Sequence, residues 1–190
     1  MKEPRHTSYA LWIGVAIFAI IAVIFSVNSS REPVPTSISD KPTKSDTLNS
    51  LGTVPSFALA DYNGRTVSLS DFDKAEVFVI NSWAVWCPFC KDELADFAAL
   101  QEEFGERIAV IAIDRQEPLA TVKGFTDAIG ITDTMTFLID PTDSFYRSIG
   151  GFSMPETIFA DANGEIRIHK RGPMRIPEMR EKVLSIINLQ

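Results

Sequence analysis

The sequence predicts an α/β domain, in which helices flank a mixed central sheet, preceded by a single transmembrane helix. Three observations lead to this prediction. Strand and helix patterns alternate along residues 51–190, as in sheets that are covered by helices on their faces. Two Asn-Gly pairs, Asn63-Gly64 and Asn163-Gly164, indicate antiparallel hairpins. The run of residues 9–27 contains no charged side chain.

The apolar run of residues 9–27 is the predicted membrane anchor. As a helix it would be about 28 Å long, close to the hydrocarbon thickness of a bilayer. Lys2 and Arg5 lie in the preceding segment 1–8, which we expect in the cytoplasm, with the rest of the chain exported. A cleaved signal peptide is the alternative, but its apolar region normally spans about 7–15 residues and ends in small residues. The run here is longer, which favours an uncleaved anchor.

Residues 28–50 are predicted to be a flexible linker between the membrane and the domain. The segment is rich in Ser, Thr and Pro and contains almost no large apolar side chain. Such a composition cannot bury enough surface to offset the entropy of ordering the chain.

Each element of the domain 51–190 is expected from its local pattern. Short alternating runs flank Asn63-Gly64 and predict an N-terminal hairpin. Continuous β-rich runs at 75–83 and 107–114 predict strands that are buried on both faces. Apolar residues at helical spacing after Pro88 predict a helix. The other expected elements are helices at 118–131 (a central insert), 142–150 and 176–188, and strands at 134–140 and on both sides of Asn163-Gly164.

Composition excludes several kinds of function. The chain has 45% hydrophobic residues and 13 Phe, which is ample for a core. From Leu51 onward 13 Lys and Arg face 21 Asp and Glu, a net charge of −8, so we expect no nucleic-acid partner. We also expect no metal, because zinc prefers about four ligands. His6 and His169 are the only histidines, and both lie far from the cysteines in the sequence. No other cofactor is expected.

Cys87 and Cys90 are the only cysteines. Cys87 is expected to leave a strand and to begin a helix, with Cys90 one turn inside that helix. Three residues of separation would bring the two sulfurs together across the first helical turn. The amides and the partial positive charge at a helix N-terminus stabilise a thiolate, which is the attacking species in disulfide exchange. The pattern therefore predicts that Cys87 attacks a partner disulfide and that Cys90 resolves the mixed disulfide.

The segment "NSWAVWCPFCKDEL" resembles the signature of membrane-anchored thioredoxin-like proteins of the TlpA/ResA type, a group that includes the cytochrome c maturation thiol reductases. "SMPETIFADANGEI" is similar to a second block of that family. The resemblance covers about residues 52–188 and implies a thioredoxin-like fold. It also implies that Pro155 is a cis-proline facing the disulfide and that Met154 offers its backbone to a bound partner.

Two departures affect the expected chemistry, one from thioredoxin itself and one from many relatives of the TlpA/ResA type. Asn81 stands where thioredoxin has a buried acid, so Glu93, three residues after Cys90, is the expected proton acceptor. The dipeptide between the cysteines is Pro-Phe, and this dipeptide tunes the redox potential. Alternatives remain for single residues: Glu93 as a solvated acid, and Pro155 as an ordinary trans-proline. Trp86 is expected beside the sulfurs and Trp83 in the core.

The sequence thus predicts an enzyme, a thiol–disulfide oxidoreductase anchored in the cell membrane. Its partners would be disulfide-containing proteins outside the cytoplasm and a membrane protein that donates thiols. A peroxiredoxin is a second hypothesis, but Ala84 and Ile80 stand where that family has Thr and Pro. A third is a non-catalytic binding module on the same scaffold, and the cysteine pair with Pro155 disfavours it.

Overall fold

The computed structural model describes residues 50–190, so the predicted cytoplasmic segment, anchor and nearly all of the linker lie outside the described residues. Within residues 50–190 none of the helices is both long and apolar enough to cross a membrane.

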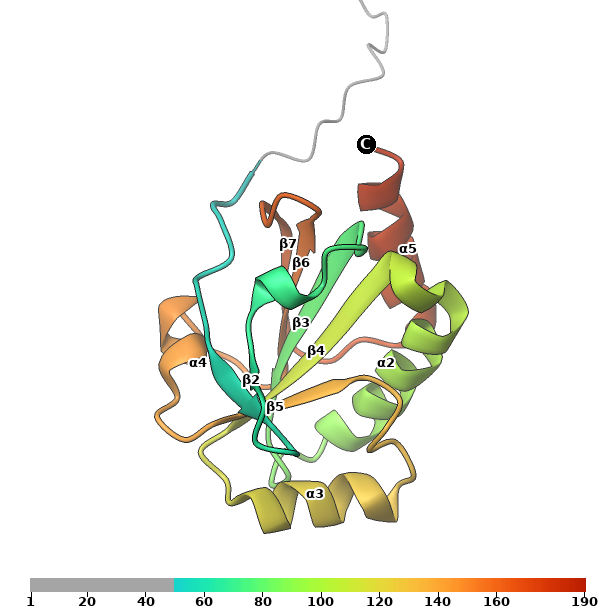
Figure 1. Cartoon of the computed structure of the whole chain (residues 1–190). Coiled ribbons are helices and arrows are strands. Elements are labelled where there is room, and N and C mark those ends of the chain that lie inside the picture. The colour runs from blue at the N-terminus through green and yellow to red at the C-terminus, as the bar shows by residue number, and fades with distance from the viewer. Residues whose placement is uncertain (1–49) are drawn as a thin grey trace, which may run out of the picture. The chain divides into compact units, whose positions relative to one another are not determined.

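A seven-stranded mixed sheet forms the centre of the domain, with the strand order β2-β1-β5-β4-β3-β6-β7 (Figure 1). The three inner strands β3, β4 and β5 are parallel, and β1, β6 and β7 add antiparallel pairs. The strands are β1 (Leu59–Asp61), β2 (Thr66–Val67), β3 (Val77–Trp83), β4 (Ile108–Arg115), β5 (Thr136–Asp140), β6 (Glu156–Asp161) and β7 (Ile166–Arg171). The predicted mixed sheet is confirmed.

Both predicted hairpins form, because their turns contain glycines in the left-handed region. Gly64 has φ 78° between β1 and β2, and Gly164 has φ 77° between β6 and β7. Glycine adopts the left-handed conformation at little energetic cost, so the two Asn-Gly pairs indicated the positions of the hairpin turns. The N-terminal hairpin extends the sheet by pairing β1 with β5.

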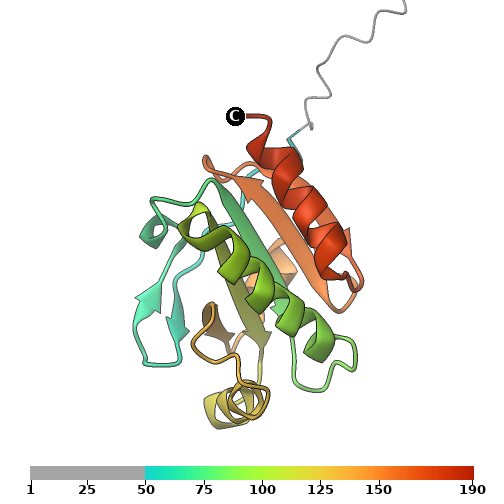
Figure 2. The ribbon, with the colours of Figure 1, turned by 90° about the vertical axis from the view of Figure 1, so that its right-hand side faces the viewer.

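Helices cover both faces and one end of the sheet. They are α2 (Cys90–Phe104), α3 (Leu119–Ala128), α4 (Ser144–Ser148) and α5 (Ile176–Ile187), with short 3-10 turns at Leu69–Asp71 and Gly105–Arg107. Figure 2 shows α2 and α5 side by side on one face. Phe97 of α2 and Val183 of α5 share a buried cluster there with Val79 of β3.

The remaining helices close the other surfaces of the domain. On the opposite face Phe145 of α4 packs with Ile80 and Ile111. At one end of the sheet α3 places Phe125 with its ring centroid 5.8 Å from that of Trp83. Trp83 is fully buried, as predicted. The C-terminal ends of β3 and β4 therefore lie next to α3 and to the segment that carries the cysteines.

Candidate active site

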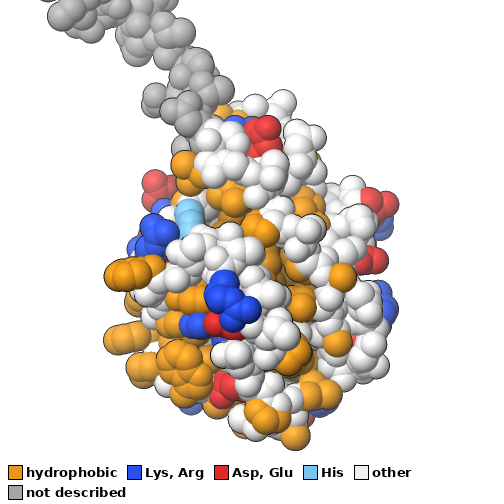
Figure 3. All heavy atoms as spheres, turned by 90° about the vertical axis from the view of Figure 1, so that its left-hand side faces the viewer, with side chains coloured by type: hydrophobic (Ala, Val, Ile, Leu, Met, Phe, Trp, Pro, Cys, Tyr) orange, Lys and Arg blue, Asp and Glu red, His pale blue; other side chains and the backbone are white. Residues whose placement is uncertain are grey.

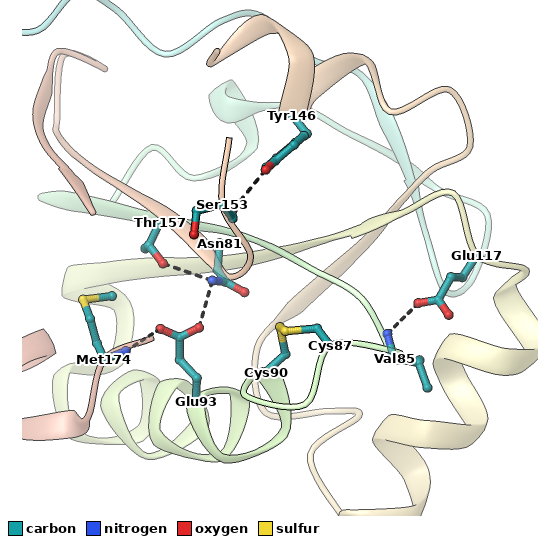
Figure 4. Close-up of a disulfide and its surroundings, with 10 residues drawn as sticks. All are labelled: Asn81, Val85, Cys87, Cys90, Glu93, Glu117, Tyr146, Ser153, Thr157 and Met174. Carbon is teal, nitrogen blue, oxygen red and sulfur yellow. Dashed lines mark hydrogen bonds between the residues drawn. A yellow bond between two sulfur atoms is a disulfide. The ribbon is translucent and has the colours of Figure 1, made fainter. Parts of the chain in front are cut away.

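The two cysteines lie in the segment between the end of β3 and the start of α2, and they are joined by a disulfide. Figure 4 shows this disulfide above the first turn of α2. The segment 84–89 forms two successive turns, in which the amide of Cys87 donates to the carbonyl of Ala84 at 3.1 Å and that of Cys90 to Cys87 at 3.2 Å. Only 4% of Cys87 and 1% of Cys90 is exposed.

The start of α2 differs from the prediction. Cys87 was expected to begin the helix and Cys90 to lie one turn inside it, but the helix begins at Cys90, with Cys87 in the preceding turn. Pro88 has no amide to donate, and the bond from Cys90 to Cys87 spans three residues and not four, so the chain enters the helix through a tighter turn. Cys87 nevertheless remains one turn before the helix N-terminus.

Glu93 is a buried carboxyl one turn along α2 from Cys90. Its Oε1 accepts the backbone amide of Met174 at 2.9 Å, and its Oε2 accepts the side-chain amide of Asn81 at 3.3 Å (Figure 4). Asn81 also donates to the hydroxyl of Thr157 at 3.0 Å. Burial raises the pKa of Glu93 to about 8, although the two hydrogen bonds favour its ionised form. The structure therefore places Glu93 away from solvent, unlike the solvated acid that was the alternative.

A second loop, residues 149–155, connects α4 to β6 and reaches the same end of the sheet. The peptide bond between Met154 and Pro155 is cis. Tyr146 of α4 donates its hydroxyl to the carbonyl of Ser153 at 3.0 Å (Figure 4). Met154 packs against the apolar cluster that contains both cysteines, so the structure brings the segment before Pro155 to the disulfide.

Glu156, the residue after the cis-proline, is hydrogen-bonded to the backbone of this loop. It is fully buried, and its Oε2 accepts the backbone amides of Phe152 at 2.9 Å and Ser153 at 3.0 Å. Its Oε1 lies 2.6 Å from Nε2 of His169 and 3.2 Å from Nε of Arg171, both on β7. His169 is thus on the edge strand and faces a buried carboxyl group.

Large apolar side chains are exposed in the two segments that meet at the disulfide. Trp86 is 62% exposed, Phe89 59% and Phe152 87%, and all three lie in the segments 84–89 and 149–155. Hydrophobic side chains also gather on the lower part of the face that Figure 3 shows. Exposed aromatic residues next to a reactive group are typical of surfaces that bind other proteins.

Glu156, Tyr146 and Phe152 were not predicted from the sequence. Glu156 begins the strand "ETIFAD", which contains the apolar run Ile158–Ala160, and an acidic residue next to such a run is rarely buried without partners; this was the available signal. Nothing in the local sequence marks Tyr146 or Phe152, because their roles depend on the packing of α4 against the loop. Within residues 50–190 no group of three or more His, Cys, Asp or Glu side chains is placed to hold a metal ion.

A mixed sheet flanked by four helices within residues 50–190, with a disulfide between two cysteines three apart where β3 leads into α2, defines a thioredoxin-like fold with a redox-active cysteine pair. The chain belongs to the AhpC/TSA family, whose model matches residues 52–169.

The chain is similar over most of its length to named thiol–disulfide oxidoreductases. It is 28% identical to the thiol:disulfide interchange protein DsbE of Allochromatium vinosum, covering 92% of this chain and 91% of that one. It is also 28% identical to the thiol-disulfide oxidoreductase ResA of Geobacillus thermodenitrificans, covering 70% and 76%. The chain is therefore a thiol–disulfide oxidoreductase, as predicted.

Solved structures have the same fold. The pneumococcal exposed lipoprotein thioredoxin of Streptococcus pneumoniae superimposes with a TM-score of 0.62 at 22% identity, over 69% of this chain and 99% of that one. StoA from Bacillus subtilis gives a TM-score of 0.58 at 20% identity, over 68% and 97%. These likenesses confirm the thioredoxin-like fold.

Proposed function

We propose that this oxidoreductase is anchored in the cell membrane by residues 9–27 and reduces disulfides of protein partners outside the cytoplasm. The observation that carries the proposal is the disulfide between Cys87 and Cys90, with the buried carboxyl of Glu93 one helical turn further on and the exposed Trp86 and Phe89 next to the cysteines in the sequence. A cysteine pair in this position supplies two electrons, and the aromatic surface suits a protein partner more than a small molecule.

The reaction runs from the reduced form in two exchange steps. First, the thiolate of Cys87 attacks one sulfur of the partner disulfide, a new bond forms between Cys87 and the partner, and the other partner sulfur leaves as a thiolate. Second, Cys90 attacks the sulfur of Cys87, which closes the bond between Cys87 and Cys90 and releases the partner's second sulfur. The partner gains two electrons and two protons, and the oxidoreductase ends in the oxidised form.

Glu93 accepts the proton of Cys90 in the second step under this proposal. Its pKa of about 8 is close to that of a free thiol, so a proton can pass between the two groups with little change in free energy. Because Asn81 and Met174 hold the two oxygens of Glu93, the carboxyl stays in place during the cycle.

Partner binding falls to the loop before Pro155 and to the aromatic residues. Among residues 50–190 no hydrogen bond uses the backbone of Met154, which leaves its amide and carbonyl for the main chain of an extended partner segment. Trp86 would flank that segment on the side of the cysteines. The amides of Phe152 and Ser153 are already held by Glu156, so they fix the loop and do not bind the partner.

An exported oxidoreductase needs electrons from a thiol donor in the membrane, because cytoplasmic reductants cannot reach it. We propose such a donor as the second partner. Among pathways, maturation of c-type cytochromes fits best, since "PETIFADANGEI" resembles the thiol reductases of that process.

Reduction of a partner disulfide by the full-length chain tests the proposal. We expect the reduced chain to reduce the disulfides of insulin, and the Cys87→Ser variant to lose this activity at least about 100-fold, because no other thiolate can make the first attack. Equal rates for both proteins would reject the function.

Accessibility of Cys87 tests the location separately. In intact cells treated with a reductant, a thiol reagent that cannot cross the membrane should label Cys87 without permeabilisation. Labelling only after the membrane is opened would reject the exported location while leaving the enzymatic function untouched.

A further inference from the structure

A pair of carboxyl side chains, Asp114 and Glu117, lies beside the active-site segment and takes no part in the steps above. Asp114 is fully buried near the end of β4, opposite Trp83 in the register of the sheet. Glu117 follows it by three residues, and its backbone amide donates to Oδ1 of Asp114 at 3.0 Å. The two residues therefore close a turn at the strand end nearest the cysteines.

The side chain of Glu117 reaches across to the segment that carries the cysteines. Its Oε2 accepts the backbone amide of Val85 at 2.5 Å, as Figure 4 shows. Val85 comes two residues before Cys87 and directly before the exposed Trp86. The segment of Val85 belongs to neither a helix nor a strand, and Glu117, in the connection between β4 and α3, provides the acceptor for this amide.

Asp114 has an oxygen that the other hydrogen bonds do not satisfy. Its Oδ2 is buried and has no donor among residues 50–190. Burial, together with the carboxyl of Glu117, raises the pKa of Asp114 well above its usual range.

The backbone between these two residues has an unusual conformation at Gln116. Gln116 has φ 65°, in the left-handed region that residues other than glycine seldom adopt. Its amide donates to the carbonyl of Asp140 at 3.1 Å, which fixes the turn to β5. Strain of this kind is retained where the surrounding structure depends on the geometry it produces.

We propose that Glu117 is a positioning residue for disulfide exchange: it holds the amide of Val85 and thereby fixes the segment that presents Cys87 and Trp86. The inference concerns the oxidoreductase activity in either direction, so it does not depend on which partner the chain reduces.

Two substitutions separate positioning from charge. Glu117→Ala removes the acceptor for Val85. Glu117→Gln removes the ionisable group but keeps an amide oxygen that can accept the amide of Val85. Glu102→Ala, an exposed position on α2, is the matched control. The first readout is hydrogen exchange of the Val85 amide by NMR in the full-length chain, relative to the amide of Ile111 in β4, so that global unfolding cancels.

We expect Glu117→Ala to speed exchange of Val85 relative to Ile111 at least tenfold, while Glu117→Gln and Glu102→Ala stay within about twofold of the parent chain. The second readout is the pH profile for alkylation of Cys87 in the reduced protein. The Ala variant should differ in midpoint from the Gln variant, because only the Ala variant lets Cys87 move relative to α2.

An unchanged exchange ratio in Glu117→Ala would overturn the proposal, and so would Ala and Gln variants with the same alkylation profile. Neither readout requires a partner protein, so a failure here is distinguishable from a failure of the proposed function, which the Cys87→Ser comparison tests. A loss of thermal stability alone, with both readouts unchanged, would assign Glu117 a structural role and also contradict the proposal.

Discussion

Glu93 is a carboxyl group that the fold buries at a cost and then holds with two donors. The amide of Met174 and the side chain of Asn81 satisfy its oxygens, and the remaining effect of burial leaves its pKa near 8. A carboxyl group in this state can take up or release a proton near neutral pH, which an exposed glutamate cannot do. The environment of the residue, more than its identity, makes it suitable for the role.

Replacing Glu93 with Gln tests that role at the level of the reaction. We expect Glu93→Gln to slow the resolving step at least about tenfold, since the amide cannot accept the proton of Cys90. Asp92→Asn is the matched control, because Asp92 lies on the same turn of α2 but is exposed, and its rate should not change. Single-turnover kinetics of mixed-disulfide release would measure both, and equal rates for Glu93→Gln and the parent chain would remove Glu93 from the mechanism.

The same carboxyl should make stability depend on pH in a defined direction. Its pKa is raised in the folded state, so the folded protein holds this proton more tightly than the unfolded chain. The contribution is therefore largest below the unfolded pKa of about 4.3 and declines as pH rises towards about 8. Denaturant unfolding at pH 5 and pH 8 should show that the stability of the parent chain relative to Glu93→Gln falls over this window. If the stability of the parent chain relative to Glu93→Gln instead rose with pH, the raised pKa of the buried Glu93 would be contradicted.

The loop 149–155 shows how one element can be fixed for partner binding. The guanidinium of Arg115 lies 3.5 Å from the ring centroid of Tyr146, and the hydroxyl of Tyr146 donates a hydrogen bond to the carbonyl of Ser153. A Cβ at Gly151 would meet the ring of Tyr146 at 2.5 Å, which is closer than real contacts allow. Because the ring is held on its other side by Arg115, the loop would have to shift.

We therefore expect Gly151→Ala to reduce partner-disulfide reduction several-fold and to lower the free energy of unfolding by about 1–3 kcal/mol. Gly124→Ala is the matched control, since nothing lies within 4 Å of a Cβ there and α3 should gain about 1 kcal/mol from the better helix former. Insulin reduction and denaturant unfolding measure the two effects. A Gly151→Ala variant as active and as stable as the parent chain would show that the loop tolerates displacement.

Local sequence patterns predicted the strands and helices of the domain more accurately than the residue at which a turn ends and the next helix begins. The buried strands and both hairpins followed from β-rich runs and from Asn-Gly pairs, and these signals act over a few residues. The start of α2 was predicted one turn too early, because Pro88 is equally acceptable in the first turn of a helix and in the turn before it. Only the bond from Cys90 to Cys87 distinguishes the two, and it depends on the tertiary position of the segment.

At the scale of the whole molecule, the site is assembled from segments far apart in sequence. Asn81 comes from β3, Glu93 from α2, Thr157 from β6 and Met174 from the segment before α5. The motif around the cysteines predicted Cys87, Cys90 and Glu93, since these share one helix and its approach. The roles of the Met174 amide and of the Glu156 side chain could not be predicted, because no local sequence pattern indicates which backbone amide will donate a hydrogen bond to a buried carboxyl group.

The central claim is that Cys87 attacks a partner disulfide while Cys90 resolves the product. The most direct measurement is to isolate the full-length Cys90→Ser variant from cells under conditions that preserve disulfides and to identify any partner bound to Cys87. The account predicts a mixed disulfide at Cys87 that reductant releases, and none in a variant that also carries Cys87→Ser. Absence of any such complex in Cys90→Ser, or the same complex without Cys87, would contradict the account.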